Sequence, residues 1–167
     1  MNQSKEPHAE SIELTGLNCS SANFEQVFEF LFQKIIKVDP TRRLQELVFD
    51  SLPADLTILD LNLIERFGRS VQNVDSLSIK NMRDTKTETR QAMALLVLTI
   101  LHGPSTPEIL RLENLGLETQ DWVSILEILL EKNCSSLKDL SLKENEELWD
   151  PESACPTMIK QLLTMQE

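Results

Sequence analysis

The stretch Leu137-Lys-Asp-Leu140-Ser-Leu142-Lys-Glu-Asn145-Glu-Glu-Leu148 contains the pattern that decides the fold. Leucine occupies its first, fourth, sixth and twelfth positions, and asparagine occupies the ninth. This spacing is typical of a repeating unit in which a short strand and a turn lead into a covering helix. One such unit cannot bury its apolar face alone, so we expect further units upstream.

The same spacing occurs four more times at earlier positions, in weaker form. The fourth position of each copy serves as its anchor, and the anchors are Ile12, Leu47, Leu77, Leu110 and Leu140. Consecutive anchors are separated by 35, 30, 33 and 30 residues. A chance string of leucines would not keep this period over five copies. We therefore predict about five strand–helix units, with strand motifs over residues 9–17, 44–52, 74–82, 107–115 and 137–148.

Helical patterns with start and stop signals separate the predicted strands. Asp55 is expected to cap a helix that ends at Gly68. Thr85 and Glu88 have the spacing of a capping box ahead of the next helix. Thr119 is expected to cap a third helix, which has a single apolar stripe about 100° wide. The residues of this stripe are Trp122, Ile125, Leu126, Leu129 and Leu130.

The two ends of the chain have weaker patterns. A helix is predicted over about residues 20–38, capped by Ser20 or Ser21 and closed by Asp39-Pro40. A short last helix is predicted over about residues 156–165, with Pro156 in its first turn. Residues 1–7 are predicted to be a disordered tail, and residues 8–167 a single domain.

The order strand, helix, strand predicts parallel strands, because antiparallel neighbours would need only a hairpin. Polar and apolar residues alternate in the strands, as in Ser76-Leu77-Ser78-Ile79-Lys80. A parallel sheet covered on both faces would have near-continuous apolar runs instead. We therefore expect an α/β solenoid with helices on its convex side and a bare, polar, concave sheet.

These motifs make the chain resemble the leucine-rich repeat superfamily, in its long-repeat form like ribonuclease inhibitor, over roughly residues 9–165. That superfamily usually has asparagine or cysteine at the ninth motif position, which only Asn145 matches. The other copies have Leu17, Leu52, Met82 and Leu115 there. Three copies have a turn residue one place earlier: Gly16, Asn81 and Asn114. Irregular turns are therefore expected, and the motif indicates an architecture but not a particular function.

The resemblance implies that partners bind on the concave face, which the outward-facing strand residues would form. The predicted central row is Glu13, Val48, Ser78, Arg111 and Ser141. One flanking row is Thr15, Asp50, Lys80, Glu113 and Lys143. The other is Ser11, Glu46, Ser76, Ile109 and Asp139. Any single one could be an ordinary solvated strand residue, but apolar side chains such as Val48 and Ile109 on a bare face suggest contact with a partner.

Charge limits the class of partner. The chain has 16 basic and 27 acidic residues, a net charge of −11 and a pI near 4.7. Such a chain repels phosphate backbones, so nucleic acid is not an expected partner, whereas a basic protein is. The longest apolar run, Met93 to Leu101, is much shorter than the roughly 20 residues of a membrane helix. We therefore expect no membrane partner.

Cysteine usage and the N-terminal sequence bear on the compartment. Cys19, Cys134 and Cys155 are odd in number, widely spaced and free of any C-x-x-C motif. This pattern favours a reducing compartment over a disulfide framework or a zinc site. The first residues contain no apolar segment typical of a secretory signal, so a cytoplasmic location is expected.

No catalytic constellation is visible in the sequence. His8 and His102 are the two histidines, and no nucleophilic triad, zinc-binding motif or glycine-rich phosphate loop accompanies them. We therefore predict a non-catalytic protein-interaction module that uses no cofactor and no metal.

Other roles remain open at this point. One is a structural subunit of a large assembly, held partly through an open N-terminal edge, since no polar cap is evident before Ala9. The resemblance also allows activation of a Ran-like GTPase, for which Arg83 and Arg111 are the candidate residues. Substrate recognition in ubiquitin ligation occurs in the same superfamily, although no F-box-like segment precedes the repeats in this sequence.

Overall fold

The computed structural model describes residues 11–15, 26, 27, 30, 43–56, 60–132 and 136–165. The predicted tail over residues 1–7 lies outside the described residues, as do Cys19 and Cys134. Of the helix predicted over residues 20–38, only positions 26, 27 and 30 are described, and they are helical.

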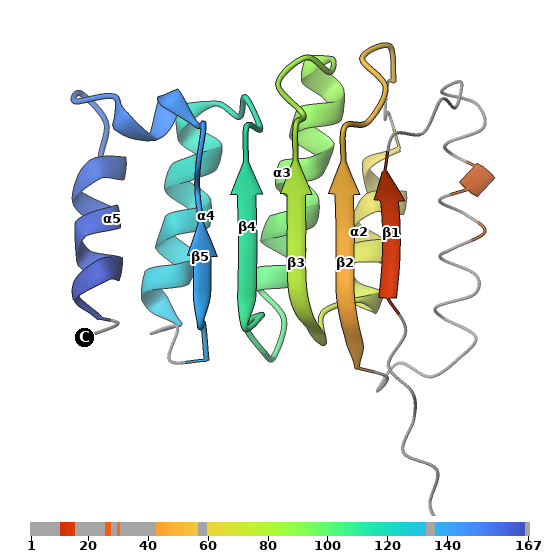
Figure 1. The fold of residues 1–167 in the computed structure, drawn as a ribbon, viewed down its shortest axis with the longest axis horizontal. Coiled ribbons are helices and arrows are strands. Elements are labelled where there is room, and N and C mark those ends of the chain that lie inside the picture. Colours follow the sequence, from red (N-terminus) through yellow and green to blue (C-terminus); the bar gives the residue numbers. More distant parts are fainter. Residues whose placement is uncertain are drawn as a thin grey trace, which may run out of the picture.

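A five-stranded, all-parallel sheet runs through the described part of the chain (Figure 1). Its strands lie side by side in chain order: β1 (Ser11–Thr15), β2 (Leu44–Asp50), β3 (Val74–Lys80), β4 (Ile109–Glu113) and β5 (Asp139–Ser141). The α/β class, the parallel strands and their order agree with the predictions from the sequence.

The register of the sheet is the one that the motif spacing predicts. Ile12 pairs with Leu47, and the same row continues through Leu77 and Leu110 to Leu140. Each strand–helix unit therefore adds one strand, and residues at the same motif position become neighbours. A shift of one residue would have moved every anchor to the opposite face of the sheet.

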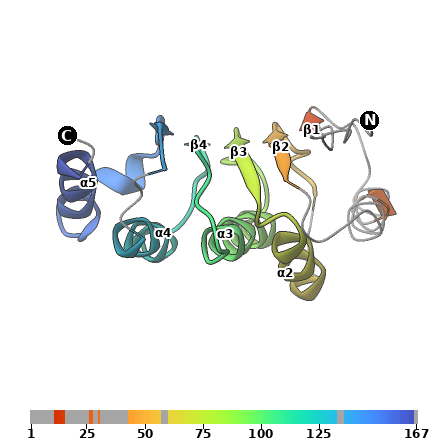
Figure 2. The same cartoon turned by 90° about the horizontal axis from the view of Figure 1, so that it is seen from below.

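The helices cover one face of this sheet. Figure 2 shows α2 (Leu61–Ser70), α3 (Thr87–Leu101) and α4 (Thr119–Glu131) in a layer on the same side. The short 3-10 helix η1 (Glu146–Trp149) and α5 (Cys155–Thr164) follow β5, and both pack against α4. Among the described residues no helix covers the opposite face, which we call the open face. None of the helices in this part of the chain has the length and apolar character needed to cross a membrane.

The core lies between the sheet and the helix layer. The inward-facing strand residues Leu47, Phe49, Leu77, Ile79, Leu110 and Leu112 are fully buried. From the helix side, Phe67 meets Phe49 edge to face, with ring centroids 6.5 Å apart. Burial of each large apolar side chain contributes about 1.5–3 kcal/mol, so these rows hold the strands to the helices.

Helix α2 begins later and ends later than the sequence predicts. Its cap is Asp60 and not Asp55, since a carboxylate oxygen of Asp60 accepts a hydrogen bond of 3.0 Å from the backbone N–H of Leu63. Gly68 does not end the helix but is buried within it. A Cβ atom there would lie 2.9 Å from the side chain of Thr99, so glycine allows α2 and α3 to approach closely.

The two predicted threonine caps are also wrong. Helix α3 begins after Thr85, whose hydroxyl donates to the carbonyl of Met82 and closes the preceding turn instead. Thr119 lies inside the first turn of α4, and Glu118 at the cap position makes no side-chain capping bond. Threonine hydroxyls readily bond to nearby backbone groups in turns, and this local bond competes with a capping role.

The turns after the strands are regular, contrary to the expectation. The residue four places after the anchor has a left-handed backbone in four successive turns: Ser51 (φ 56°), Asn81 (55°), Asn114 (52°) and Glu144 (60°). Asparagine tolerates this conformation better than most residues, which explains its position one place early in the motif. Gly16 holds the same place in the first unit but lies outside the described residues.

Backbone hydrogen bonds link these turns in one direction. The N–H groups of Ser51, Asn81 and Asn114 donate to the carbonyls of Lys80, Glu113 and Lys143, respectively, in the following unit. Asn145 extends the pattern with its side chain, which is 1% exposed. Its Oδ1 accepts from the N–H of Leu115 at 2.8 Å, and its Nδ2 lies 2.7 Å from the carbonyl of Leu112.

Candidate functional site: the open face of the sheet

The outward-facing residues form the rows that the sequence predicts. Residues in register across the centre are Glu13, Val48, Ser78, Arg111 and Ser141. One flanking row contains Ser11, Glu46, Ser76, Ile109 and Asp139. The other contains Thr15, Asp50, Lys80 and Glu113, and Lys143 follows the end of β5. The side chain of Thr15 lies outside the described parts of the chain.

Three carboxylates surround Val48 on the β1–β2 half of this face. Glu13 is its register partner on β1, and Glu46 and Asp50 lie two residues before and after it on the same side of β2. Val48 is half-buried, and Glu13 and Glu46 are exposed. Within the described residues, neither glutamate has a hydrogen bond or an ion pair. This half therefore presents unused acceptors around an apolar side chain.

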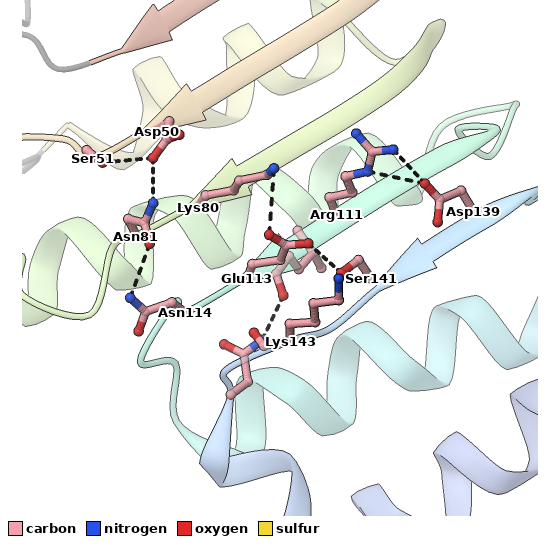
Figure 3. A network of polar contacts seen from close by, with 12 residues as sticks. Asp50, Ser51, Lys80, Asn81, Arg111, Glu113, Asn114, Asp139, Ser141 and Lys143 are labelled. Atoms are coloured by element: carbon pink, nitrogen blue, oxygen red, sulfur yellow. Dashed lines mark hydrogen bonds and ion pairs between the residues drawn. The ribbon is translucent and has the colours of Figure 1, made fainter.

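Ion pairs organise the β3–β5 half (Figure 3). Arg111 donates from Nε and Nη2 to the same oxygen, Oδ2 of Asp139, at 3.2 and 2.7 Å. Hydrogen bonding to Asp139, and then its charge, raises the pKa of Arg111 above the ordinary value. Glu113 accepts from the Ser141 hydroxyl and lies 3.6 Å from the Lys80 ammonium.

A depression of about 390 Å³ lies over these ion pairs. Its lining residues are Lys80, Arg111, Glu113, Asp139, Leu140, Ser141 and Lys143. Arg111 Nη1 and the exposed ammonium of Lys143 have no hydrogen bond to another described residue. The depression is therefore polar and retains unused donors, whereas the β1–β2 half retains unused acceptors.

Asparagines in the turns extend the polar network along the edge of this face. Asn114 donates from Nδ2 to Oδ1 of Asn81 at 3.2 Å, and Asn81 donates to Oδ1 of Asp50 at 2.8 Å. The Ser51 hydroxyl also donates to Oδ1 of Asp50, at 2.8 Å (Figure 3). These bonds fix the orientation of the Asp50 carboxylate. Sequence reasoning did not place Ser51, Asn81 or Asn114 at the site, although the early asparagines were a visible signal.

Ser78 differs from the other residues predicted for this face. Its side chain faces the open side of the sheet but is only 4% exposed. Its register partners Val48 and Arg111 are both larger, and side chains of adjacent strands lie close enough to cover a serine. Ser78 is therefore unsuited to contact a partner. Ile109, the second apolar residue predicted on the face, is half-buried.

The two arginines considered for GTPase activation are both held in ion pairs. Arg111 pairs with Asp139, as described above. Arg83 lies in the turn after β3, 3.4 Å from Glu146 and 3.1 Å from Glu147, and its buried Nε has no hydrogen-bond partner among the described residues. Gly116 makes room for it, because a Cβ atom there would lie 3.1 Å from Arg83 Cα. These contacts tie the partly exposed side chain of Arg83 to η1.

A second hollow, of about 670 Å³, lies at the amino ends of the strands. Arg43 pairs there with Asp75 and lies 3.6 Å from Glu108, which in turn lies 2.8 Å from the Lys138 ammonium. The hydrogen bond from Lys138 lowers the pKa of Glu108 below its ordinary value. Two basic and two acidic side chains pair with one another here, so these four described residues leave no net charge for a partner.

The described residues contain no group of three or more histidine, cysteine, aspartate or glutamate side chains placed to hold a metal ion. Comparison of the chain with protein-family models, with curated proteins and with solved structures found no match.

Proposed function

We propose that this protein is a non-catalytic protein-interaction module of the leucine-rich repeat type, and that a protein partner binds across the open face. Three features support the repeat type: strands added in chain order, anchors in one row, and a left-handed residue at the same place in successive turns. The buried ladder position of Asn145 is a fourth. A cytoplasmic location belongs to the same proposal, and the free thiol of Cys155 fits it.

The observation that carries the proposal is the environment of Val48. An apolar side chain lies among the unused carboxylates of Glu13 and Glu46 and the fixed carboxylate of Asp50. A lysine or arginine of a partner satisfies both properties, since its aliphatic stem packs on Val48 and its charged end reaches the carboxylates. The net charge of −11 would also steer a basic partner towards the molecule, more weakly as salt is added.

A structural role in a larger assembly is the alternative. Among the described residues, β1 is an edge strand, because β2 is its only neighbour. An open edge offers backbone groups to another chain. This role predicts a large complex at all salt concentrations, whereas a steered adaptor separates from its partner as salt is raised. Sedimentation of the native protein at low and high salt distinguishes the two.

The test uses two charge-reversed variants with equal charge change. Glu13→Lys with Glu46→Lys alters the open face, and Glu127→Lys with Glu131→Lys alters exposed positions of α4 in the helix layer. Proteins captured by the wild type are identified, and the partner is then titrated by calorimetry against all three proteins. We expect the open-face variant to lose binding and the α4 variant to retain it. Equal affinities for the two variants would contradict the proposal.

Cross-linking adds a positional readout to the same experiment. Lys80 and Lys143 belong to the open face, whereas Lys160 is exposed on α5. An amine-reactive cross-linker should join the partner to Lys80 or Lys143. Cross-links through Lys160 alone would place the partner elsewhere.

A further inference from the structure

The two halves of the open face differ in the kind of hydrogen-bonding group that is left unused. Around Val48, the described residues offer three carboxylates. The nearest cations are Lys80, opposite Asp50, and Arg111, which feels the charge of Glu46, and they are paired with Glu113 and Asp139. Over β3 to β5, three cations accompany two carboxylates, and donors remain unused at Arg111 Nη1 and at Lys143. An occupant that complements the whole face must therefore carry a donor at one end and an acceptor at the other.

The register gives the distance between the two halves. Val48 and Arg111 lie two strands apart and Val48 and Ser141 lie three apart, which correspond to about 10 and about 14 Å at roughly 4.8 Å per strand. An extended peptide rises about 3.3 Å per residue, and alternate side chains point to the same side, so side chains four residues apart are about 13 Å apart. That spacing matches the separation of the two halves.

We infer that the open face binds an extended peptide segment crossing the strands, with a lysine or arginine over Val48 and, four residues away, a carboxylate in the depression at Arg111 and Lys143. This inference rests on the function proposed above and specifies the partner. An amphipathic helix fits less well, because helix-binding grooves are lined by apolar residues. In the outward-facing rows of the described strands, Val48 and Ile109 are the apolar side chains. The direction of the peptide across the strands is not fixed by charge, so both orders of the pair belong to the inference.

The experiment uses short fluorescein-labelled peptides of serine and threonine that contain one arginine and one glutamate. In the test peptides the two residues are four apart, in both orders. In a control of the same composition they are three apart, so that they point to opposite sides of an extended chain. A second control has them seven apart, the spacing that spans about 10 Å in a helix. A third replaces the glutamate with a second arginine.

Fluorescence anisotropy of the intact protein should show one four-apart peptide binding roughly two- to fivefold more tightly than the three-apart control, the range of one partly exposed ion pair. Charge exchange then tests the assigned positions. Glu46→Lys should weaken the binding of this peptide and strengthen the binding of a peptide in which glutamate replaces the arginine. Lys143→Glu should strengthen the binding of a peptide in which arginine replaces the glutamate. The α4 change Glu127→Lys should leave the order of affinities unchanged.

Several outcomes would overturn the inference. Equal or tighter binding of the all-basic peptide would mean that the face reads positive charge alone, and tighter binding of the seven-apart peptide would indicate a helix. Absence of measurable binding by every peptide would also reject it. In these cases a partner that is lost from the Glu13→Lys, Glu46→Lys variant would still support the proposed function. Indifference of the partner to that variant would reject both.

Discussion

Asn145 accepts a hydrogen bond of 2.8 Å from the backbone N–H of Leu115, although the two residues are 30 positions apart in the chain. The same side chain donates to the carbonyl of Leu112. A buried amide thereby bonds one backbone group of β4 and one of the turn that follows it. The link joins consecutive strand–helix units where the last strand is short.

Replacement of Asn145 by alanine should therefore destabilise the protein strongly. The change leaves the N–H of Leu115 and the carbonyl of Leu112 buried without the bonds to Asn145, which costs about 2–6 kcal/mol in total. Chemical unfolding measures the free energy. Asn62→Ala, at an exposed position of α2, is the control and should change it very little. If Asn145→Ala lowered the free energy of unfolding no more than the control does, water would have to reach the turn and replace the lost hydrogen bonds.

Gly68→Ala tests the contact between α2 and α3. Alanine favours a helix by about 1 kcal/mol over glycine, but its Cβ would lie 2.9 Å from Thr99. Overpacking of this kind costs typically 1–3 kcal/mol, so we expect net destabilisation. A higher melting temperature than the wild type would mean that the two helices separate without cost.

Leu47 and Val48 are adjacent in sequence and face opposite sides of β2. Leu47 is fully buried, and Leu47→Ala should cost about 2–5 kcal/mol. Val48→Ala should cost about 1 kcal/mol or less, because the side chain lies on the open face. Thermal and chemical unfolding of both variants provide the comparison. Similar losses for the two would contradict the assignment of the faces.

Asp121 should make the stability depend on pH. Burial in the first turn of α4 raises the pKa of its carboxyl above the ordinary value of 3.8, and the nearby charge of Glu118 adds to the rise while a hydrogen bond to the Glu118 backbone opposes it. A raised folded pKa contributes stability that is present below pH 3.8 and is lost as pH rises through the folded value. The wild type should thus gain stability relative to Asp121→Asn on acidification. Chemical unfolding of both proteins at a series of pH values below neutral gives the difference in their unfolding free energies. This difference should shift in favour of the wild type as the pH falls. A difference that stays constant with pH would exclude the effect.

Much of the sheet could be predicted from the sequence because its signal is periodic. Anchors such as Leu77 and Leu110 must be buried, and strand alternation then places Ser78 and Arg111 on the other face. Helix starts were harder, because several residues near each start are able to cap. Asp55 and Asp60 are chemically equivalent candidates, and only the packing of α2 selects the second.

The polar contacts of the site could be predicted only in part. The predicted rows place Arg111 opposite Ser141. Its ion pair, however, is with Asp139, two residues earlier on the neighbouring strand, and depends on side-chain conformation. The burial of Ser78 depends on the size of the residues beside it, and not on its own polarity. The sequence predicts a helix end at Gly68, because a glycine needed for close packing of two helices looks the same in sequence as one that terminates a helix.

The backbone bonds of the turns have a polarity that bears on how the chain reaches its final form. Donors at Ser51, Asn81 and Asn114 belong to one unit, and their acceptors belong to the next. During synthesis from the N-terminus, the N–H group in each turn would stay without its hydrogen-bond acceptor until the following unit had been made and folded. The turn hydrogen bonds would then form one after another towards the C-terminus. Among the described units, the bond from the N–H of Leu115 to the side-chain oxygen of Asn145 would form last.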